Sequence, residues 1–362
     1  MLKIEITAAD VGRRLDKYLM AYLNDAPRTL IFKFLRKKKI KHNSKRAEGN
    51  ELLADGDTIE LYLSDEMLAG CRKKPPQMAD STLPTVKCEI SLLQISIPTD
   101  LCRCRKRHGI IHEDENLLII NKPAGLPSHA GMKSKEAHLL AQILCYLRQT
   151  NAYPPDATFT PALCNRLDVN TSGLVISGKN YQAIRAMNAL FASEGSIAKT
   201  YLAVVEGELR GEATLAGIYS KDTNTNIARV KPITTPNTTD AEYVVVNEGA
   251  NTPRVVTAYT SLCVANGRTL LSVNPITGRS HQIRAHLAAI GHPLVGDRKY
   301  GGKPLRGVKN QLLHCYALEL TKPILCYPTG TKWIAEPPEM FMKIINEWFP
   351  AQRAVLRRSE EA

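Results

Sequence analysis

The chain is organised around one stretch, Cys164-Asn165-Arg166-Leu167-Asp168-Val169-Asn170-Thr171-Ser172-Gly173-Leu174-Val175-Ile176. Its middle is rich in residues that favour turns, and the apolar run after the glycine is typical of a buried strand. Arg166 and Asp168 therefore lie on a loop held by an adjacent strand, a common place for functional residues. On spacing alone the better interpretation is structural, with Asp168 capping a turn and Arg166 pairing with it. Other parts of the chain favour a functional role for these two residues instead.

The composition is that of a globular protein with a basic surplus. A chain of 362 residues is long enough for two or three domains, and 44% hydrophobic with 23% charged residues are ordinary globular values. The net charge of +13 favours polyanionic partners. Residues 1–50 hold 13 Lys and Arg against 5 Asp and Glu, so most of the surplus belongs to a basic amino-terminal module.

Several classes of protein are disfavoured. No run approaches the length of a membrane span, and the first residues lack the apolar core of a signal peptide. Nine scattered cysteines without zinc-like spacing indicate reduced thiols in a cytoplasmic protein. There is no His-Glu-x-x-His pattern, and His281 and His286 belong to diverging faces of one expected helix, so no metal is predicted. The chain also lacks a glycine-rich phosphate loop and a Gly-x-Ser-x-Gly elbow, and we expect no cofactor.

Residues 12–63 are predicted to form a small α/β module. Apolar residues recur at helical spacing from Leu15 to Leu23, and a second helix is expected to begin at Pro27. The second helix and its exit carry a cationic cluster, which consists of Arg36, Lys37, Lys38, Lys39 and Lys41. Such a cluster could be only a solvated face, but its concentration on one part of a compact module favours binding to a phosphate backbone.

This module resembles the αL-type RNA-binding domain first known from ribosomal protein S-four. The resemblance rests on Arg14-Leu15-Asp16, Phe34-Leu35-Arg36 and Gly56-Asp57-Thr58-Ile59. It implies that residues 1–63 bind structured RNA. Residues 64–108 are broken by prolines and end in basic residues, so we interpret them as a linker in which only 88–97 could form a short strand.

Residues 109–350 are predicted to form a mixed α+β domain with a largely antiparallel sheet. Strands and helices are both indicated, but they lack the regular alternation of a doubly wound sheet. Ser280 is expected to be the N-cap of a helix that carries His281 and Arg284 on one face. The other expected elements are helices around 139–147, 184–191 and from about 337, a hairpin excursion within 211–254, strands around 110–120, 174–176, 199–205, 255–264, 269–273 and 312–320, and a charged tail at 351–362.

Four segments of this domain, taken together, resemble the RluA-type pseudouridine synthases. They are 165–173, 199–201, 278–287 and 312–318, and the segments 122–125 and 291–297 add to the match. The resemblance covers residues 109–350, and an αL-type module in front is a common partner domain in that family. It implies an enzyme that isomerises uridine in RNA, cutting the bond from ribose to a base nitrogen and joining the ribose to a base carbon.

The resemblance also implies roles for five residues. Asp168 corresponds to the catalytic aspartate, Arg284 to the arginine that pairs with it, and Tyr201 to a tyrosine that stacks on the target base. Arg166 corresponds to a residue that fills the gap left by the flipped base, and Leu313 to an apolar position near that base, although an ordinary core leucine would also fit. The carboxylate could attack the sugar or the base, or take a proton from the sugar, and the sequence does not choose among these.

Three positions depart from the family's usual residues. Many relatives have His where this chain has Asn165, Thr where it has Ser280 and a charged residue where it has Val169. Asn and Ser remain polar and compatible with turns, so the chemistry is expected to be kept. Val169 directly follows Asp168 and could change contacts with RNA, which bears on the choice of substrate.

We therefore expect a monomeric RNA pseudouridine synthase that acts on large-subunit ribosomal RNA without cofactor, metal or membrane. One alternative keeps the chemistry and moves the substrate to transfer RNA. Another is a non-catalytic RNA-binding or ribosome-assembly factor with the same fold, but the joint presence of Asp168, Tyr201 and Arg284 favours the enzyme. The choice of uridine depends on RNA shape, which no motif marks.

Overall fold

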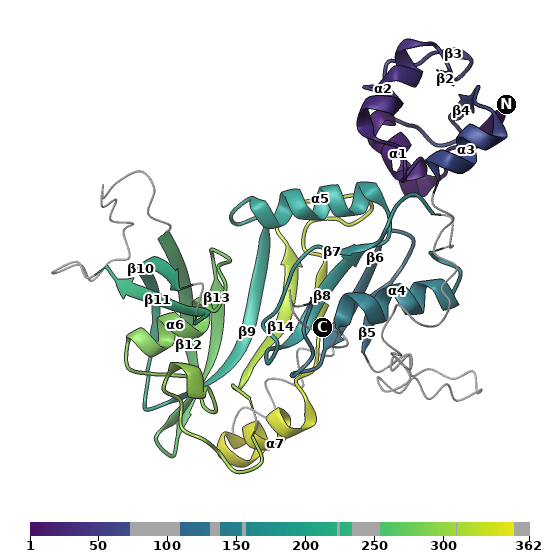
Figure 1. The fold of residues 1–362 in the computed structure, drawn as a ribbon. Coiled ribbons are helices and arrows are strands. Elements are labelled where there is room, and N and C mark those ends of the chain that lie inside the picture. Colours follow the sequence, from purple (N-terminus) through teal and green to yellow (C-terminus); the bar gives the residue numbers. More distant parts are fainter. Residues whose placement is uncertain are drawn as a thin grey trace, which may run out of the picture. The chain divides into compact units, whose positions relative to one another are not determined.

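The computed structural model describes residues 1–72, 109–130, 138–153, 157–222, 225–233, 254–308 and 310–350 (Figure 1). Most of the expected linker, including the strand considered at 88–97, and the tail at 351–362 lie outside these residues. The chain divides into two compact units. One comprises Met1–Ile119, His129–Asn165 and Ile176–Ala189, and the other comprises Ile120–Ser128, Arg166–Val175 and Leu190–Ala362.

The first unit begins with a small module of helices and a four-stranded sheet in the order β1-β4-β2-β3. The helices expected from apolar spacing are present, and Pro27 directly precedes the second of them. Their apolar sides form the module's core, where Leu19 and Ile31 are fully buried together with Ile59 of the sheet. The elements are β1 (Leu2–Glu5), η1 (Ala8–Asp10), α1 (Leu15–Tyr22), α2 (Arg28–Arg36), β2 (Ile40–His42), β3 (Lys45–Arg46), β4 (Thr58–Leu61) and α3 (Asp65–Cys71).

Helix α3 extends this module past Leu63, after which the sequence suggests a linker. Ser64 caps the helix, because its hydroxyl accepts a hydrogen bond from the backbone N–H of Met67 at 3.3 Å. Cys71, at the end of the helix, is buried in the apolar core of the module. The core of the module therefore includes residues beyond 63.

The strands and helices expected between residues 109 and 192 are also present. Asp114 closes the turn between the first two strands, because its Oδ1 accepts hydrogen bonds from the backbone N–H groups of Asn116 and Leu117, both at 2.8 Å. The elements are β5 (Ile110–Glu113), β6 (Leu117–Lys122), α4 (Leu139–Gln149), β7 (Ala162–Leu163), β8 (Ser172–Gly178) and α5 (Tyr181–Ala192).

The large sheet confirms the expected α+β class with largely antiparallel pairing. Its strand order is β11-β10-β12-β13-β9-β14-β8-β6-β5, with β15 paired to β14 and β7 to β8. Neighbours from β11 to β14 are antiparallel, whereas β14 and β8 are parallel. No helix within the described ranges is both long and apolar enough to cross a membrane. The remaining elements are β9 (Ile197–Glu206), β10 (Glu212–Asp222), β11 (Ile227–Pro232), β12 (Arg254–Ala265), β13 (Arg268–Pro275), α6 (Gln282–Ala289), η3 (Arg298–Tyr300), β14 (Leu313–Leu320), β15 (Lys332–Ile334) and α7 (Glu339–Trp348).

Strand β9 contributes to two separate apolar clusters, because its side chains alternate between the faces of the sheet. Val204 lies in a cluster with Ile345 of α7. Val205 lies in a different cluster with Leu287 of α6, and Tyr201 packs against that second cluster. Tyr201 is therefore on the face of the sheet that α6 covers (Figure 1).

The prediction of Ser280 as the N-cap of α6 is wrong. The helix begins at Gln282, and its N-cap is His281, which has left-handed backbone angles of φ 55° and ψ 15°. The side chain of Gln282 holds the preceding turn, because its Oε1 accepts hydrogen bonds from the backbone N–H of Arg279 at 3.0 Å and the hydroxyl of Thr277 at 2.8 Å. No side chain of the described residues caps the first turn of α6, and Gln282 instead holds the turn that precedes the helix.

Candidate active site

The backbone on both sides of Asp168 is fixed by hydrogen bonds. The hydroxyl of Ser128 accepts from the N–H of Leu167 at 3.2 Å and donates to the carbonyl of the same residue at 2.9 Å. On the other side, the carbonyl of Val169 accepts from the N–H of Gly125 at 2.8 Å. The position of Asp168 therefore depends on the segment 122–128.

Lys122 is fully buried and supports the same loop. Its ammonium group donates to the carbonyls of Pro123, Leu126 and Val169 at 2.9, 2.8 and 3.0 Å. Burial lowers the pKa of Lys122 to about 7, and the negative charge of Asp168 opposes this change. Lys122 connects the segment after β6 to the loop that carries Asp168.

A glycine is required where this loop enters β8. Gly173 has a φ of +116°, and a Cβ at this position would lie 2.2 Å from the backbone oxygen of Cys315 on the parallel strand β14. The neighbouring Ser172 places its Oγ 2.8 Å from Nδ1 of His314, whose Nε2 lies 2.8 Å from the carbonyl oxygen of Ala335. Because a carbonyl can only accept, Nε2 of His314 carries the proton and Nδ1 accepts from Ser172.

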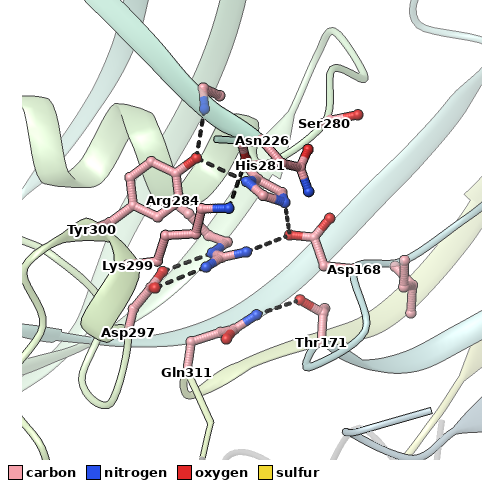
Figure 2. A network of polar contacts seen from close by, with 12 residues as sticks. Asp168, Thr171, Asn226, Ser280, His281, Arg284, Asp297, Lys299, Tyr300 and Gln311 are labelled. Carbon is pink, nitrogen blue, oxygen red and sulfur yellow. Dashed lines mark hydrogen bonds and ion pairs between the residues drawn. The ribbon is translucent and has the colours of Figure 1, made fainter. Parts of the chain in front are cut away.

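Asp168 and Asp297 share one arginine (Figure 2). Oδ2 of Asp168 accepts a hydrogen bond from Nη1 of Arg284 at 3.1 Å. The Nε and Nη2 atoms of Arg284 donate to the two oxygens of Asp297 at 2.7 and 2.8 Å. The side chain of Asp297 is 1% exposed and that of Asp168 is 23% exposed, so one carboxylate is enclosed and the other is accessible.

The charge of Arg284 is secured by its surroundings. Burial disfavours the charged guanidinium, but the hydrogen bonds and negative charges of Asp297 and Asp168 outweigh it and raise the pKa of Arg284 above its ordinary value. The guanidinium carbon also lies 4.8 Å from the centre of the Tyr300 ring, at the distance of a cation–π contact. A fixed positive charge therefore stands beside Asp168.

His281 is the second group beside Asp168. Its Nε2 lies 3.8 Å from Oδ2 of Asp168, and its Nδ1 lies 2.8 Å from the hydroxyl oxygen of Tyr300 (Figure 2). That oxygen also accepts a hydrogen bond from the backbone N–H of Ala228 at 2.8 Å. Arg284 and His281 thus approach the same oxygen of Asp168, and Oδ1 has no hydrogen-bond or ion-pair partner among the described residues.

Tyr201 lies on β9 between Cys315 of β14 and Val273 of β13. It is half-buried. Burial, the neighbouring thiol of Cys315 and the charge of Asp168 raise the pKa of Tyr201 well above its ordinary value. At neutral pH the side chain is therefore a flat apolar ring with an uncharged hydroxyl.

Known proteins match this chain over the region that holds these residues. Residues 116–289, which include Asp168, Tyr201 and Arg284, match the family model described as RNA pseudouridylate synthase. The chain is 32% identical over 317 residues to ribosomal large subunit pseudouridine synthase C of Rickettsia bellii (strain RML369-C), with 87% of this chain and 91% of that protein covered. The chain belongs to the RNA pseudouridylate synthase family. It is an RNA pseudouridine synthase, an isomerase.

A second relative bears the same name, and one solved structure is similar in fold. A protein of the same name from Vibrio vulnificus (strain CMCP6) is 29% identical to this pseudouridine synthase over 332 residues, which cover 89% of this chain and 90% of the relative. The solved structure of Human RNA Pseudouridylate Synthase Domain Containing 4 is similar in fold, with a TM-score of 0.51, 23% identity, and coverage of 66% of this chain and 92% of that one.

The structure brings three of the predicted site residues of the pseudouridine synthase together and separates others from them. Arg284 is hydrogen-bonded to Asp168, as expected, and Tyr201 is close enough to Asp168 for the carboxylate to affect its pKa. Arg166 is exposed and makes no ion pair with any described residue. Leu313 is 4% exposed and packs in the apolar cluster beneath α6, which is the environment of a core leucine.

The cationic cluster lies in the first unit, at the end of α2 and the beginning of β2. Arg36, Lys37 and Lys38 are exposed, whereas Lys39 and Lys41 are half-buried. Lys41 lies over the ring of Tyr62, with Nζ 4.9 Å from the ring centre. The charges of Arg36, Lys37 and Lys38 are therefore the most accessible to a partner in solution.

Sequence reasoning missed three polar residues of the site, namely Asp297, Tyr300 and His281 as a neighbour of Asp168. Asp297 and His281 belong to the segments 291–297 and 278–287 that carried the family resemblance, so a signal was present for both. Tyr300 had no such signal. Among the described residues, no group of three or more His, Cys, Asp or Glu side chains is arranged to hold a metal ion.

Proposed function

We propose that this pseudouridine synthase converts uridine to pseudouridine in large-subunit ribosomal RNA, with Asp168 as the catalytic carboxylate. The observation that carries the proposal is the environment of Asp168, whose Oδ2 is engaged by Arg284 while the side chain is 23% exposed. Relatives that match about nine-tenths of this chain bear the name ribosomal large subunit pseudouridine synthase C, which supports the choice of RNA.

The reaction breaks the bond between the ribose and a base nitrogen and forms a bond between the ribose and a base carbon. A proton leaves that carbon and the nitrogen gains one, so the overall composition is unchanged. A carboxylate with one accessible oxygen can attack the sugar or the base, or take a proton from the sugar. In each case Arg284 balances the negative charge of Asp168 and limits its rotation.

Tyr201 is assigned to stacking on the target base. Its ring offers a flat apolar surface, and its raised pKa keeps the hydroxyl protonated, which suits stacking better than proton removal at neutral pH. Arg166, exposed two residues before Asp168, is assigned to the gap that the flipped base leaves in the RNA. Leu313, buried beneath α6, is assigned a supporting position in the wall near the base.

Residues 1–63 are assigned to RNA binding and residues 109–350 to catalysis. The exposed charges of Arg36, Lys37 and Lys38 at the end of α2 support a contact with phosphates, because such contacts depend on charge more than on sequence. We assign the enzyme to the cytoplasm, acting as a monomer and without cofactor or metal.

The test of the catalytic assignment is Asp168→Asn, which keeps the shape of the side chain and removes its charge. We expect this variant to form no pseudouridine, so RNA treated with it should show no new positions labelled by carbodiimide. Its affinity for the RNA should stay within a few-fold of the wild-type affinity. Full activity of Asp168→Asn would falsify the assignment. Absence of marked positions with the wild-type protein would instead favour a non-catalytic RNA-binding factor.

The test of the substrate is pseudouridine mapping of cellular RNA with and without this gene. We expect the lost positions to lie in large-subunit ribosomal RNA. If pseudouridine were lost only from transfer RNA, the assignment of ribosomal RNA as the substrate would be wrong, but the assignment of the reaction would stand.

A further inference from the structure

His281 has a backbone conformation that L-residues rarely adopt, directly at the candidate active site. Its φ of 55° and ψ of 15° place it in the left-handed region. A residue remains in this region only when its surroundings fix it, and such residues gather at functional sites. His281 is therefore a place to look for a function in the side chain.

The surrounding turn is fixed by Gln282, which is 3% exposed. In addition to its bonds to Thr277 and Arg279, Gln282 donates from Nε2 to the carbonyl of Val256 at 2.9 Å and approaches the hydroxyl of Thr257 at 3.0 Å. The side-chain amide of Gln282 therefore makes four hydrogen bonds with other residues of the fold. These bonds fix the backbone on either side of His281 and so hold its left-handed conformation.

The side chain of His281 lies between Tyr300 and Asp168 (Figure 2). The ring of Tyr300 packs edge-on against the imidazole, with centroids 5.7 Å apart, and its hydroxyl oxygen is 2.8 Å from Nδ1. The opposite nitrogen, Nε2, is 3.8 Å from Oδ2 of Asp168. The left-handed backbone and the tyrosine together direct Nε2 toward the carboxylate.

The contacts of His281 with Tyr300 and Asp168 favour one of its two tautomers. The backbone N–H of Ala228 donates to the hydroxyl oxygen of Tyr300 at 2.8 Å, and the hydroxyl can give its own proton as a hydrogen bond to the lone pair of Nδ1. Nε2 then carries the imidazole proton. The other tautomer would place a lone pair against the negative oxygen of Asp168.

Burial and the neighbouring positive charges lower the pKa of His281 from its ordinary value, which favours the neutral ring at pH 7. Burial lowers its pKa, the negative charge of Asp168 opposes this, and the positive charges of Arg284, Lys299 and Lys221 lower the pKa further. A neutral imidazole with its proton on Nε2 is a hydrogen-bond donor toward Asp168 without adding a charge.

We propose that His281, oriented by Tyr300, is a positioning residue that donates a hydrogen bond from its Nε2–H to Oδ2 of Asp168 when the RNA is bound. The separation of 3.8 Å is longer than a hydrogen bond, and contacts of this kind shorten when a substrate fills the site. Arg284 and His281 then hold Oδ2 from two directions and leave Oδ1 for the reaction. This inference rests on the proposed role of Asp168 as the catalytic carboxylate.

The experiment compares His281→Ala with His281→Gln, because both lose the imidazole but glutamine can still offer an N–H. Single-turnover rates of pseudouridine formation are measured on one transcribed RNA from pH 5 to 9, together with the dissociation constant for that RNA. We expect His281→Ala to lower the maximal rate by about 10-fold to 100-fold, since small misplacement of a reacting group has effects of that size. The dissociation constant for the RNA should change less than about 3-fold, because His281 is proposed to orient Asp168 and not to bind the RNA.

The pH profile separates positioning from a merely structural role. Loss of a donor to the carboxylate makes its protonation easier, so the fall in rate on the acid side should begin at higher pH in His281→Ala than in the wild type. His281→Gln should recover part of the rate and part of this shift. His292→Ala is the control, because the ring of that histidine is bonded to the carbonyl of Glu206, at 2.9 Å, and not to Asp168, so its rates should match the wild type.

Two outcomes overturn the inference. One is a rate for His281→Ala within about 2-fold of the wild type at every pH, and the other is a loss that is equal at every pH and not relieved by glutamine. Asp168→Asn, assayed alongside, keeps the two proposals distinct. If Asp168→Asn is inactive and His281→Ala is normal, only the positioning role fails, whereas an active Asp168→Asn removes the proposed function itself.

Discussion

Arg284 reaches Asp168 through a single nitrogen, at 3.1 Å, because its other two hydrogen-bonding nitrogens are engaged by Asp297 at 2.7 and 2.8 Å. The pair with Asp297 is bidentate and buried, so water and salt screen it little. The orientation of Arg284 is thus set by Asp297, and Asp168 meets a guanidinium that is already in place.

The substitution Arg284→Lys tests this division of roles. A lysine supplies the charge but is shorter and lacks the planar group that holds both oxygens of Asp297 while a third nitrogen reaches Asp168. We expect the single-turnover rate to fall by about 100-fold, and the free energy of unfolding to fall by about 3 kcal/mol because the buried Asp297 loses its bidentate partner. Rates on transcribed RNA and urea unfolding measure the two effects.

The double variant Arg284→Lys with Asp297→Asn is the control for this prediction. Once Asp297 has lost its charge, the lysine no longer leaves a buried anion without its bidentate partner, so the two stability losses should not add. A sum of independent losses, or a wild-type rate for Arg284→Lys, would contradict the shared-arginine arrangement.

Gly173→Ala should be far more damaging than an ordinary glycine substitution. Gly173 has a φ of +116°, and its Cβ would lie 2.2 Å from the backbone oxygen of Cys315, whereas Gly211 has a φ of +77° and a Cβ there would meet no atom within 4 Å. We expect Gly211→Ala to cost about 1 kcal/mol for backbone strain alone. Gly173→Ala should cost about 3 kcal/mol or more, because β14 must move as well.

The activity of Gly173→Ala should also fall, since Gly173 lies at the beginning of the strand that fixes the Asp168 loop. Thermal unfolding and pseudouridine formation at a temperature where both variants remain folded provide the measurements. Equal stability losses for the two alanine variants would show that β14 yields easily at this point.

The sequence predicted most of the helices and strands, because their apolar periodicity reflects burial on one side. It also led to the pairing of Asp168 with Arg284, through a family resemblance rather than through spacing, since 115 intervening residues separate them in a chain of 362. Ser280 was misassigned because local sequence gives no sign that the side chain of Gln282 folds back to hold the turn at Thr277.

The remaining parts of the site depend on contacts between distant segments. Tyr300 contacts His281 only because η3 packs near the beginning of α6. The hydroxyl of Tyr300 also accepts a hydrogen bond from a backbone N–H of β11. Lys122 belongs to the segment 122–125 that added to the family resemblance, but nothing in the sequence shows that its ammonium group is enclosed among three carbonyls. Such arrangements follow from the fold and not from any local pattern.

Lys122→Met should impair catalysis more than stability. Methionine keeps the apolar part of the side chain and removes the bonds to Pro123, Leu126 and Val169. The lost hydrogen bonds destabilise the folded protein, but the variant no longer has to bury a positive charge, which is favourable. We therefore expect the free energy of unfolding to fall by only about 1 kcal/mol. Because Val169 adjoins Asp168, the rate should fall by about 10-fold or more.

The exposed Lys322 provides the control for that prediction. Lys322→Met should match the wild type in urea unfolding and in single-turnover rate. A Lys122→Met protein with a normal rate would mean that the Gly125 bond to Val169 is enough to hold the loop.

His314 should make the protein less stable in mild acid. Burial lowers its pKa to about 4, although the hydrogen bond to the carbonyl of Ala335 opposes this change. Below the ordinary histidine value near 6.5 the unfolded chain takes up a proton that the folded protein refuses, so stability falls as pH drops from about 6.5 toward 4. Between pH 7 and 5 this contribution is about 2 kcal/mol.

Urea unfolding at pH 7 and pH 5 measures this effect in the wild type and in His314→Asn. The asparagine variant should be less stable at pH 7, because it loses the bond to Ala335, but its difference between the two pH values should be smaller. An unchanged difference would show that other groups, such as the buried His286, dominate the acid response.

Removal of two charges from the cationic cluster should weaken RNA binding in a salt-dependent way. Arg36 and Lys37 are exposed at the end of α2, whereas Lys3 and Lys17 are exposed elsewhere in the same module, so the two alanine pairs change the net charge equally. If Arg36 and Lys37 contact phosphates, their double variant should flatten the slope of log affinity against log salt by about 1.5, because each lost contact removes a share of counterion release. The Lys3 and Lys17 pair should leave the slope nearly unchanged. Filter-binding titrations of the full-length protein at several salt concentrations give both slopes, and equal slopes for the two pairs would remove the cationic cluster from the RNA interface.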